Sequence, residues 1–224
     1  MLDRGHVIIP IKGLIRGKSR LAAHLPSMSV YLLNLANLDR TVRAAVEFFG
    51  PDRCVVVSPC KLTCDTVRLM GLRVLFQDLD DGLNAGVEYA RAHVRAAGAS
   101  TITVLPVDLA HVSAVTLQAA LGRCMGPGLA AVVPDTDAQG TNLLSMPADF
   151  DLMFAFGCGS FESHLRQLRA GGLSVRVAEP CALQEDIDTI EQLRRVCDTS
   201  QDAVLSIPMC HVAPYTKHRS HFEF

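Results

Sequence analysis

The sequence lacks an excess of charge of either sign. Its 21 Lys and Arg residues are nearly matched by 23 Asp and Glu residues, which leaves a formal net charge of -2. Binding to duplex nucleic acid depends on a basic surface. We therefore expect no nucleic-acid partner.

Long apolar runs are also missing. No stretch approaches the roughly 20 apolar residues that span a bilayer, and the segment from Met1 to His6 does not have the charged-then-apolar layout of a signal peptide. The 8 cysteines include no C-x-x-C pair, and several fall in segments of strand or helix length, so we interpret them as reduced and mostly buried. These features predict a cytoplasmic protein with no membrane partner.

Apolar residues, in contrast, make up 49% of the chain, which is enough for a sizeable core in a single domain. Apolar runs of strand length alternate with helical patterns along most of the sequence. This alternation predicts an α/β fold with a mostly parallel sheet. The expected strands are His6–Ile11, Arg53–Ser58, Arg73–Gln77, Thr101–Pro106, Leu129–Pro134, Asn142–Met146 and Leu173–Ala178, and the expected helices are Val30–Phe49, Asp65–Met70, Gly82–Ala97, Ala114–Met125, Ser160–Ala170 and Thr189–Val196.

The strand at Asn142–Met146 follows the preceding one after only a short loop, which predicts one antiparallel strand in the sheet. We expect the domain to cover residues 1–200 and a tail to cover residues 201–224. The tail loses periodicity and includes an apolar stretch, Val204–Pro208, that could support a homodimer. A metal site in the tail is conceivable, but the ligand spacing is irregular and favours a surface or subunit-contact segment. Its candidate ligands are Cys210, His211, His218 and His221.

Ligands bind to open α/β sheets at the carboxyl ends of the strands, so the residues just after each strand are of most interest. The first strand runs into a glycine-containing basic loop, whose N–H groups and cations suit a triphosphate. The loop misses the Walker A spacing by one residue, and a solvated basic turn is the alternative. Its residues of interest are Lys12, Gly13, Arg16, Gly17, Lys18 and Arg20.

Acidic residues follow two other strands. Asp108 comes directly after a buried strand, where a carboxylate can hold Mg²⁺. Asp186 and Asp188 precede the last helix and point the same way if the segment is extended, so one of them could complete the site. Helix capping is the alternative for all three carboxylates.

Two further segments have the composition of anion-binding turns. Asp137–Asn142 precedes the antiparallel strand, and Phe156–Phe161 is a glycine-rich turn in which Ser160 begins a helix. Free N–H groups and a hydroxyl at such a turn can hold a phosphate or a carboxylate. A tight turn with Ser160 as an N-cap explains the same residues.

Together these segments resemble the 2-phospho-L-lactate guanylyltransferase family of coenzyme F(420) biosynthesis, which includes phosphoenolpyruvate and 3-phospho-D-glycerate guanylyltransferases. The resemblance covers residue 7 to about residue 196, in the family's order. Its most specific part is the pair Gly140-Thr141-Asn142 and Phe156–Phe161; the other matching segments are Ile9–Lys12, Lys18–Leu21, Leu105–Asp108 and Asp186–Thr189.

The resemblance implies a three-layer α/β/α fold of the nucleotide-diphospho-sugar transferase type, in which GMP is transferred from GTP to a small phosphorylated acid and pyrophosphate is released. It implies that the basic loop and Asn84 serve GTP, with Gly13 and Lys18 among the nucleotide-binding residues. Thr141, Gly157 and Ser160 are then expected to bind the acid. Asp108 and one of Asp186 and Asp188 are expected to bind Mg²⁺, and Lys12, Lys18, Arg20 and Asp108 are the expected catalytic residues.

Such a reaction needs no general base, because a phosphate oxygen is already an anionic nucleophile near neutral pH. The site has to align two anions and neutralise the charge on the phosphates. Two other functions remain open from sequence. A P-loop-like phosphotransferase would release a nucleoside diphosphate, and a non-catalytic nucleotide-binding domain would consume no GTP.

Overall fold

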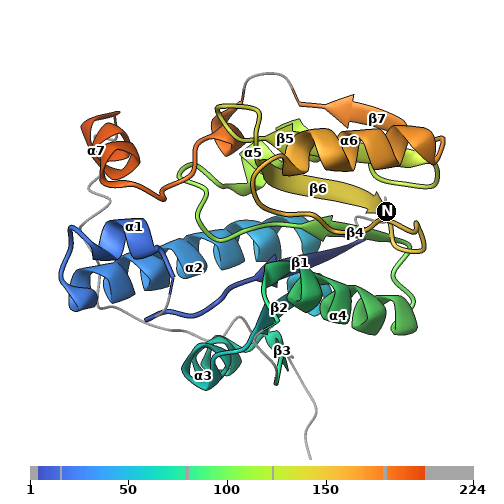
Figure 1. Cartoon of the computed structure of the whole chain (residues 1–224). Helices are drawn as coiled ribbons and strands as arrows, with labels where there is room; N and C mark the ends of the chain where they lie inside the picture. The colour runs from blue at the N-terminus through green and yellow to red at the C-terminus, as the bar shows by residue number, and fades with distance from the viewer. Residues whose placement is uncertain (1–4, 16, 79–80, 123, 179–180, 200–224) are drawn as a thin grey trace, which may run out of the picture.

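The computed structural model describes residues 5–15, 17–78, 81–122, 124–178 and 181–199. Within these residues a seven-stranded sheet has the order β3-β2-β1-β4-β6-β5-β7 (Figure 1). All seven expected strands are present, with ends that differ by at most a few residues. They are β1 (His6–Pro10), β2 (Cys54–Ser58), β3 (Arg73–Phe76), β4 (Thr101–Val104), β5 (Leu129–Pro134), β6 (Thr141–Pro147) and β7 (Ser174–Val177).

Strand β6 is the one antiparallel strand of this sheet. It pairs antiparallel with both β4 and β5, whereas every other neighbouring pair is parallel. The prediction from the short loop before β6 is therefore confirmed. Because β6 runs backwards, its first residues lie at the edge where β4 and β5 end.

Helices cover both faces of the sheet, which confirms the expected three-layer α/β/α arrangement (Figure 1). One apolar cluster joins a face of the sheet to α2, α3 and α5, and a second joins the other face to α4 and α6. The larger helices are α2 (Ser27–Phe49), α3 (Lys61–Leu69), α4 (Leu83–Ala96), α5 (Ala114–Leu121), α6 (Ser160–Ala170) and α7 (Ile190–Thr199).

Some helix boundaries depart from the expected ones. Helix α2 begins directly after Pro26 and ends at Gly50, whose positive φ of 92° favours glycine. Helix α5 ends at Leu121 and not at Met125, because Gly122 breaks it with a φ of 33°. One short helix, α1 (Ser19–Ala22), and two 3-10 turns, η1 (Pro51–Arg53) and η2 (Ala182–Gln184), were not predicted from sequence.

A third apolar cluster lies outside the main layers. It joins Leu21 of α1 and Leu33 of α2 to Ala110, Ile187 and Val196. This cluster attaches α7 and the segment before it to the amino-terminal helices. It therefore fixes the position of the acidic segment at residues 186–188.

A β-bulge changes the direction of the first side chains of β6. Val133 is paired with Leu143, but Pro134 is paired with Thr141, so Asn142 is an extra residue in β6. Leu143 packs with the α2 and α5 side of the core, and strict alternation would place Thr141 there too. Instead, the Thr141 hydroxyl contacts His164 of α6, on the other side.

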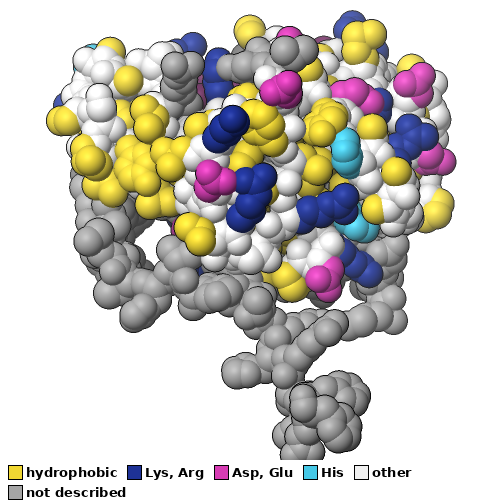
Figure 2. Space-filling view, turned by 90° about the horizontal axis from the view of Figure 1, so that it is seen from below, with side chains coloured by type: hydrophobic (Ala, Val, Ile, Leu, Met, Phe, Trp, Pro, Cys, Tyr) yellow, Lys and Arg dark blue, Asp and Glu magenta, His cyan; other side chains and the backbone are white. Residues whose placement is uncertain are grey.

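No helix among the described residues is long and apolar enough to cross a membrane. On the face shown in Figure 2, basic and acidic side chains both occur between apolar ones, so neither sign of charge dominates it. The expected tail at residues 201–224, with its candidate metal ligands and apolar stretch, lies outside the described residues.

Candidate active site

Two loops that are far apart in sequence are joined by backbone hydrogen bonds. The N–H of Ile187 donates to the carbonyl of Asp108 at 2.9 Å, and the N–H of Ala110 donates to the carbonyl of Glu185 at 2.9 Å. An isolated antiparallel bridge links Leu109 to the same segment. This pairing brings the loop after β4 against the segment that precedes α7.

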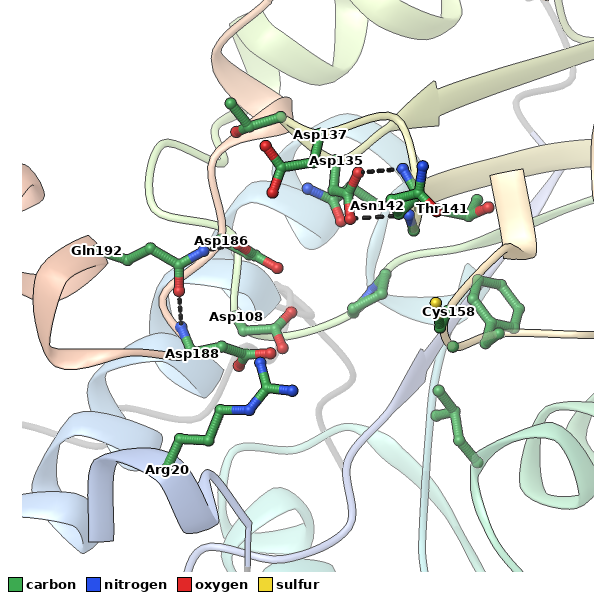
Figure 3. A pocket seen from close by; sticks show the side chains of 17 residues that line it. Arg20, Asp108, Asp135, Asp137, Thr141, Asn142, Cys158, Asp186, Asp188 and Gln192 are labelled. Carbon is green, nitrogen blue, oxygen red and sulfur yellow. Dashed lines mark hydrogen bonds between the residues drawn. The ribbon is translucent and has the colours of Figure 1, made fainter. Parts of the chain in front are cut away.

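The pairing also explains which way the acidic side chains point. Ile187 is completely buried, and its neighbours Asp186 and Asp188 both line a cavity. The two side chains therefore point to the same side, as alternate residues of an extended segment do. Asp108 lines the same cavity, so the three acidic residues lie together (Figure 3).

The cavity has a volume of about 450 Å³ and lies at the carboxyl ends of the parallel strands. Five carboxylates and one arginine contribute to its wall. It is lined by Arg20, Leu83, Pro106, Asp108, Asp135, Thr136, Asp137, Gln139, Gly140, Thr141, Asn142, Phe156, Gly157, Cys158, Asp186, Asp188 and Gln192.

Lys18 extends from the first loop to the acidic cluster. Its Nζ lies 2.9 Å from Asp188 Oδ1 and 3.7 Å from Asp108 Oδ2, and it also donates to the carbonyl of Ile187. Only 7% of the side chain is exposed, so the alternative of a solvated turn does not describe this residue. Its backbone has a left-handed conformation with a φ of 53°, which non-glycine residues adopt at an energetic cost.

Arg20, two residues later, is exposed, and its guanidinium points toward Asp108 and Asp188 (Figure 3). It is therefore available to a ligand in the cavity. Arg16 lies outside the described residues.

The clustered carboxylates perturb one another. Burial, together with the neighbouring charges of Asp188 and Asp108, raises the pKa of Asp186 to about 6. Burial also raises the pKa of Asp108, although the ammonium of Lys18 opposes this shift. The site therefore gains stability from any added positive charge.

Other residues cap the helices near these carboxylates, which rules out the capping alternative. Ser113 and Thr116 form a capping box at the start of α5, so Asp108 does not cap that helix. At α7, Thr189 Oγ1 accepts from the N–H of Gln192 at 3.2 Å. Asp186 and Asp188 are consequently free to face the cavity.

Gln192 is a residue of this site that the sequence analysis missed. Its Oε1 accepts from the N–H groups of Asp188 and Thr189, each at 2.8 Å. Its Nε2 donates to Asp186 Oδ1 at 2.6 Å. The T-x-x-Q spacing of Thr189 and Gln192 was the available signal, because it is that of a capping box.

The donor set fits a hard divalent cation. Mg²⁺ prefers carboxylate oxygens and usually needs only one or two of them, with water and phosphate oxygens completing its shell. In the described residues no group of three or more His, Cys, Asp or Glu side chains is already arranged around a common point. Lys18 instead provides the positive charge between Asp108 and Asp188.

A second wall of the cavity is a turn held by Asp135. Its carboxylate accepts from the N–H groups of Gln139 at 2.8 Å and Gly140 at 2.7 Å (Figure 3). A Cβ atom at Gly140 would lie 2.6 Å from Asp135 Oδ2, so the turn requires glycine here. Asn142 donates to the carbonyls of Leu183 and Gln184 and thereby ties β6 to η2.

The glycine-rich turn before α6 forms the opposite wall. Gly157 and Cys158 line the cavity, as does Thr141, but Ser160 is not among the lining residues. Ser160 is completely buried, and its Oγ has no hydrogen-bond partner among the described residues. Gly159, and not Ser160, occupies the N-cap position, with a left-handed φ of 74°.

Asn84 is bound to this turn. Its Oδ1 accepts from the N–H of Phe156 at 2.8 Å, and its Nδ2 donates to the carbonyl of Phe156 at 3.2 Å. The amide that the sequence analysis assigned to GTP is thus engaged by the backbone of the turn. Asn84 joins the start of α4 to the wall formed by Gly157.

A smaller cavity of about 190 Å³ lies next to the first and shares Leu83 with it. It has Lys12 and Gln77 in its wall, whereas Gly13 is in neither wall. A Cβ atom at Gly86 would lie 2.6 Å from Gln77 Oε1, so a larger residue there would displace the Gln77 side chain. The cavity is lined by Pro10, Ile11, Lys12, Val57, Pro59, Gln77, Gly82, Leu83 and Gly86.

Comparison with known families identifies the kind of enzyme that has this site. Residues 5–202 match the family described as guanylyl transferase CofC like. The chain belongs to this family. The CofC-like guanylyltransferases are nucleotidyltransferases. Membership of this family therefore argues against the two alternatives left open by the sequence, a P-loop-like phosphotransferase and a non-catalytic domain.

Two relatives cover most of the CofC-like chain. The phosphoenolpyruvate guanylyltransferase of Rubrobacter xylanophilus is 37% identical over 190 residues, which is 84% of this chain and 91% of the relative. The phosphoenolpyruvate guanylyltransferase of Chloroflexus aggregans is 32% identical over 201 residues, 88% of this chain and 98% of the relative.

Solved structures with the same fold are more distant in sequence. A protein from Desulfovibrio desulfuricans G20, assigned to the nucleotide-diphospho-sugar transferases, superposes with a TM-score of 0.71 at 14% identity and covers 88% of the CofC-like chain and 87% of its own. A nucleotidyl transferase from Methanothermobacter thermautotroptrophicus superposes with a TM-score of 0.56 at 20% identity, and the match covers 86% of this chain and 95% of the other. The expected nucleotide-diphospho-sugar transferase fold is therefore confirmed.

Proposed function

We propose that this protein transfers GMP from GTP to the phosphate of a phosphorylated three-carbon acid, in the biosynthesis of coenzyme F(420). Phosphoenolpyruvate is the first candidate for the acid, because the two relatives described above are named for it. 2-Phospho-L-lactate and 3-phospho-D-glycerate carry the same phosphate and carboxylate and are the other candidates.

The observation that carries the proposal is the acidic cluster opposite the basic first loop. Asp108, Asp186 and Asp188 line one wall of the larger cavity, and Lys18 and Arg20 reach them from the loop after β1. A cavity lined by five carboxylates repels GTP and a phosphorylated acid unless cations bind with them. This electrostatic balance supports a requirement for Mg²⁺.

In the proposed reaction, a phosphate oxygen of the acid forms a bond to the α-phosphorus of GTP. The bond breaks between that phosphorus and the oxygen that joins it to the β-phosphorus, and pyrophosphate leaves with the electron pair. No proton has to be removed from the nucleophile. The protein's task is to hold the two anions in line and to neutralise the charge that they bring together.

Each group of residues has a separate part in this task. Arg20 and Lys18 supply positive charge beside the phosphates, and Asp108 with Asp186 or Asp188 would hold Mg²⁺, which supplies charge neutralisation when bound. Thr141 and the backbone at Gly157 bind the acid in the wall formed by β6 and the turn before α6.

The smaller cavity is suited to the nucleoside of GTP. It adjoins the larger cavity through Leu83 and has a volume of about 190 Å³. Lys12 in its wall lies on the phosphate side of the nucleotide. Gln77 offers both a hydrogen-bond donor and an acceptor, as the edge of a guanine base requires.

The experiment that tests this function supplies GTP and Mg²⁺ with each of the three acids in turn. We expect pyrophosphate and a guanosine diphospho-acid, identified by its mass, with at least one acid. Release of GDP would indicate a phosphotransferase instead. Absence of GTP consumption with every acid, in a protein that still binds GTP, would contradict the proposal.

A further inference from the structure

His164 of α6 has no part in the reaction described above, yet both of its ring nitrogens are engaged beside the acid-binding wall. The side chain is completely buried. Its Nε2 lies 3.0 Å from the backbone nitrogen of Ala155, and its Nδ1 lies 3.0 Å from Oγ1 of Thr141. The ring of Phe156 packs against it edge-on, with 4.9 Å between the ring centroids.

These two contacts determine where the proton of the imidazole lies. A backbone N–H can only donate, so Nε2 must accept from Ala155 and cannot carry a proton. A neutral ring then carries its proton on Nδ1, and this N–H donates to Thr141. Burial lowers the pKa of His164 to about 4, which keeps the ring neutral near pH 7.

The direction of this hydrogen bond in turn determines what Thr141 can offer. Among the described residues, the one hydrogen-bond partner of its Oγ1 is His164, for which that oxygen is the acceptor. The hydroxyl proton is therefore available, and Thr141 lines the larger cavity. A hydroxyl whose proton is left available to donate suits an anionic oxygen, which can only accept.

We propose that His164 is a positioning residue that holds the Thr141 hydroxyl as a donor to an anionic oxygen of the acceptor acid. This inference rests on the proposed function for the identity of the ligand. The two hydrogen bonds themselves do not depend on it. His164 also fixes Ala155, next to the Phe156 backbone that Asn84 binds, so one ring sets two walls of the acid site.

The first test uses the ligand-free full chain with ¹⁵N-labelled histidine. Two-bond ¹H–¹⁵N correlation spectra distinguish the two neutral tautomers and the charged ring. We expect His164 to be protonated on Nδ1 and bare on Nε2 near neutral pH, and His164→Asn identifies its signal by removing it. The opposite tautomer, or a charged ring, overturns the proposal whatever the enzyme's substrate.

The second test separates the two nitrogens. In His164→Asn the side-chain amide nitrogen can take the place of Nδ1 and still donate to Thr141. In His164→Gln the amide reaches the place of Nε2 and leaves Thr141 without its partner. We expect the Gln variant to raise the KM for the acid about tenfold, with the KM for GTP within about twofold, and the Asn variant to restore most of the loss.

A double-mutant cycle completes the test. Thr141→Val should also raise the KM for the acid about tenfold, and adding His164→Gln to it should cause little further loss, because the two residues act as one unit. His24→Gln, at an exposed position, is the matched control. Additive losses in the double mutant, or equal losses for GTP and the acid, would overturn the proposed role of His164. A wild-type enzyme that is inactive on every acid would instead contradict the proposed function. The tautomer result would not be affected by that outcome.

Discussion

The ammonium of Lys18 binds the carboxylate of Asp188 at 2.9 Å, although 170 positions separate the two residues in sequence. Lys18 takes a left-handed backbone conformation to do so. The same ammonium lies 3.7 Å from Asp108. One side chain therefore links the loop after β1 to both acidic segments and compensates part of their charge.

Replacing this lysine should destabilise the metal-free protein. We expect Lys18→Met to lower the free energy of unfolding by about 1–3 kcal/mol, because two neighbouring carboxylates lose their shared cation. Urea denaturation without divalent ions measures the change. Lys61→Met, at an exposed position of α3, is the control, and equal values for the two variants would contradict the structural role of Lys18.

Asp108 should matter more for turnover than for substrate binding. We expect Asp108→Asn to lower kcat by about a thousandfold or more while the affinity for GTP changes only a few-fold, because the lost carboxylate acts on charge that develops during the transfer. Steady-state kinetics at several Mg²⁺ concentrations measures both. Asp52→Asn is an exposed control, and an Asp108 variant with near-normal turnover would remove this residue from the metal site.

Gln192 allows the capping of α7 to be separated from the orientation of Asp186. In Gln192→Glu the side chain can still accept from the two backbone N–H groups, but it no longer donates to Asp186. We expect a loss of turnover of about 10- to 100-fold. The new carboxylate also repels that of Asp186, so the free energy of unfolding should fall at neutral pH and recover in acid, where the two carboxylates can share a proton. Gln192→Ala removes both the helix cap and the hydrogen bond to Asp186. It should therefore lose turnover and also about 1 kcal/mol of unfolding free energy.

Asn84 should affect the acid more than the nucleotide. Its amide is bound to the backbone of Phe156, so Asn84→Ala should loosen the turn that contains Gly157. We expect the KM for the acid to rise about tenfold and the affinity for GTP to change little. Isothermal titration with GTP, beside acid-dependent kinetics, distinguishes this from a direct nucleotide contact, which would weaken GTP binding instead.

Acid should destabilise the protein through His164. Its pKa is about 4 in the folded state and near its ordinary value of 6.5 when unfolded, so between these values unfolding takes up a proton. The stability that the neutral ring provides is complete above about pH 6.5 and is lost as the pH falls toward 4. The variant His164→Asn cannot titrate at this position. Relative to it, the free energy of unfolding of the wild type should fall by up to about 3 kcal/mol over this range. Parallel pH profiles with the same slope would contradict the low pKa.

The strands were predictable from sequence because their signal is local. Residues 54–57 form one continuous run and are all apolar and buried, as expected of a strand covered on both faces. Helix α1 was missed since its four residues contain no repeat of the helical period. Its place is determined by Leu21, which packs against residues distant in sequence.

Most of the residues that form the site were predictable from sequence, but the contacts among them were not. The carboxylates after two strands suggested that Asp108 and Asp188 would meet, and the structure brings them to one cavity. That Lys18 lies between them depends on a backbone conformation that no sequence pattern indicates. His164 was missed for a similar reason, because a single histidine in a helix gives no sign of the partners on its two nitrogens.

The bulge at Asn142 makes the length of this part of the chain as important as its residue types. Inserting one residue between Val133 and Pro134 would give Asn142 a partner in β5, restore strict alternation and turn the Thr141 side chain to the side of α2 and α5, with every residue of the motif still present. A relative that keeps Gly-Thr-Asn but has one more residue at the end of β5 would therefore present a different side chain to the proposed acid site. When substrate preference is compared across the family, the alignment gaps around residues 134–142 deserve the same weight as the substitutions.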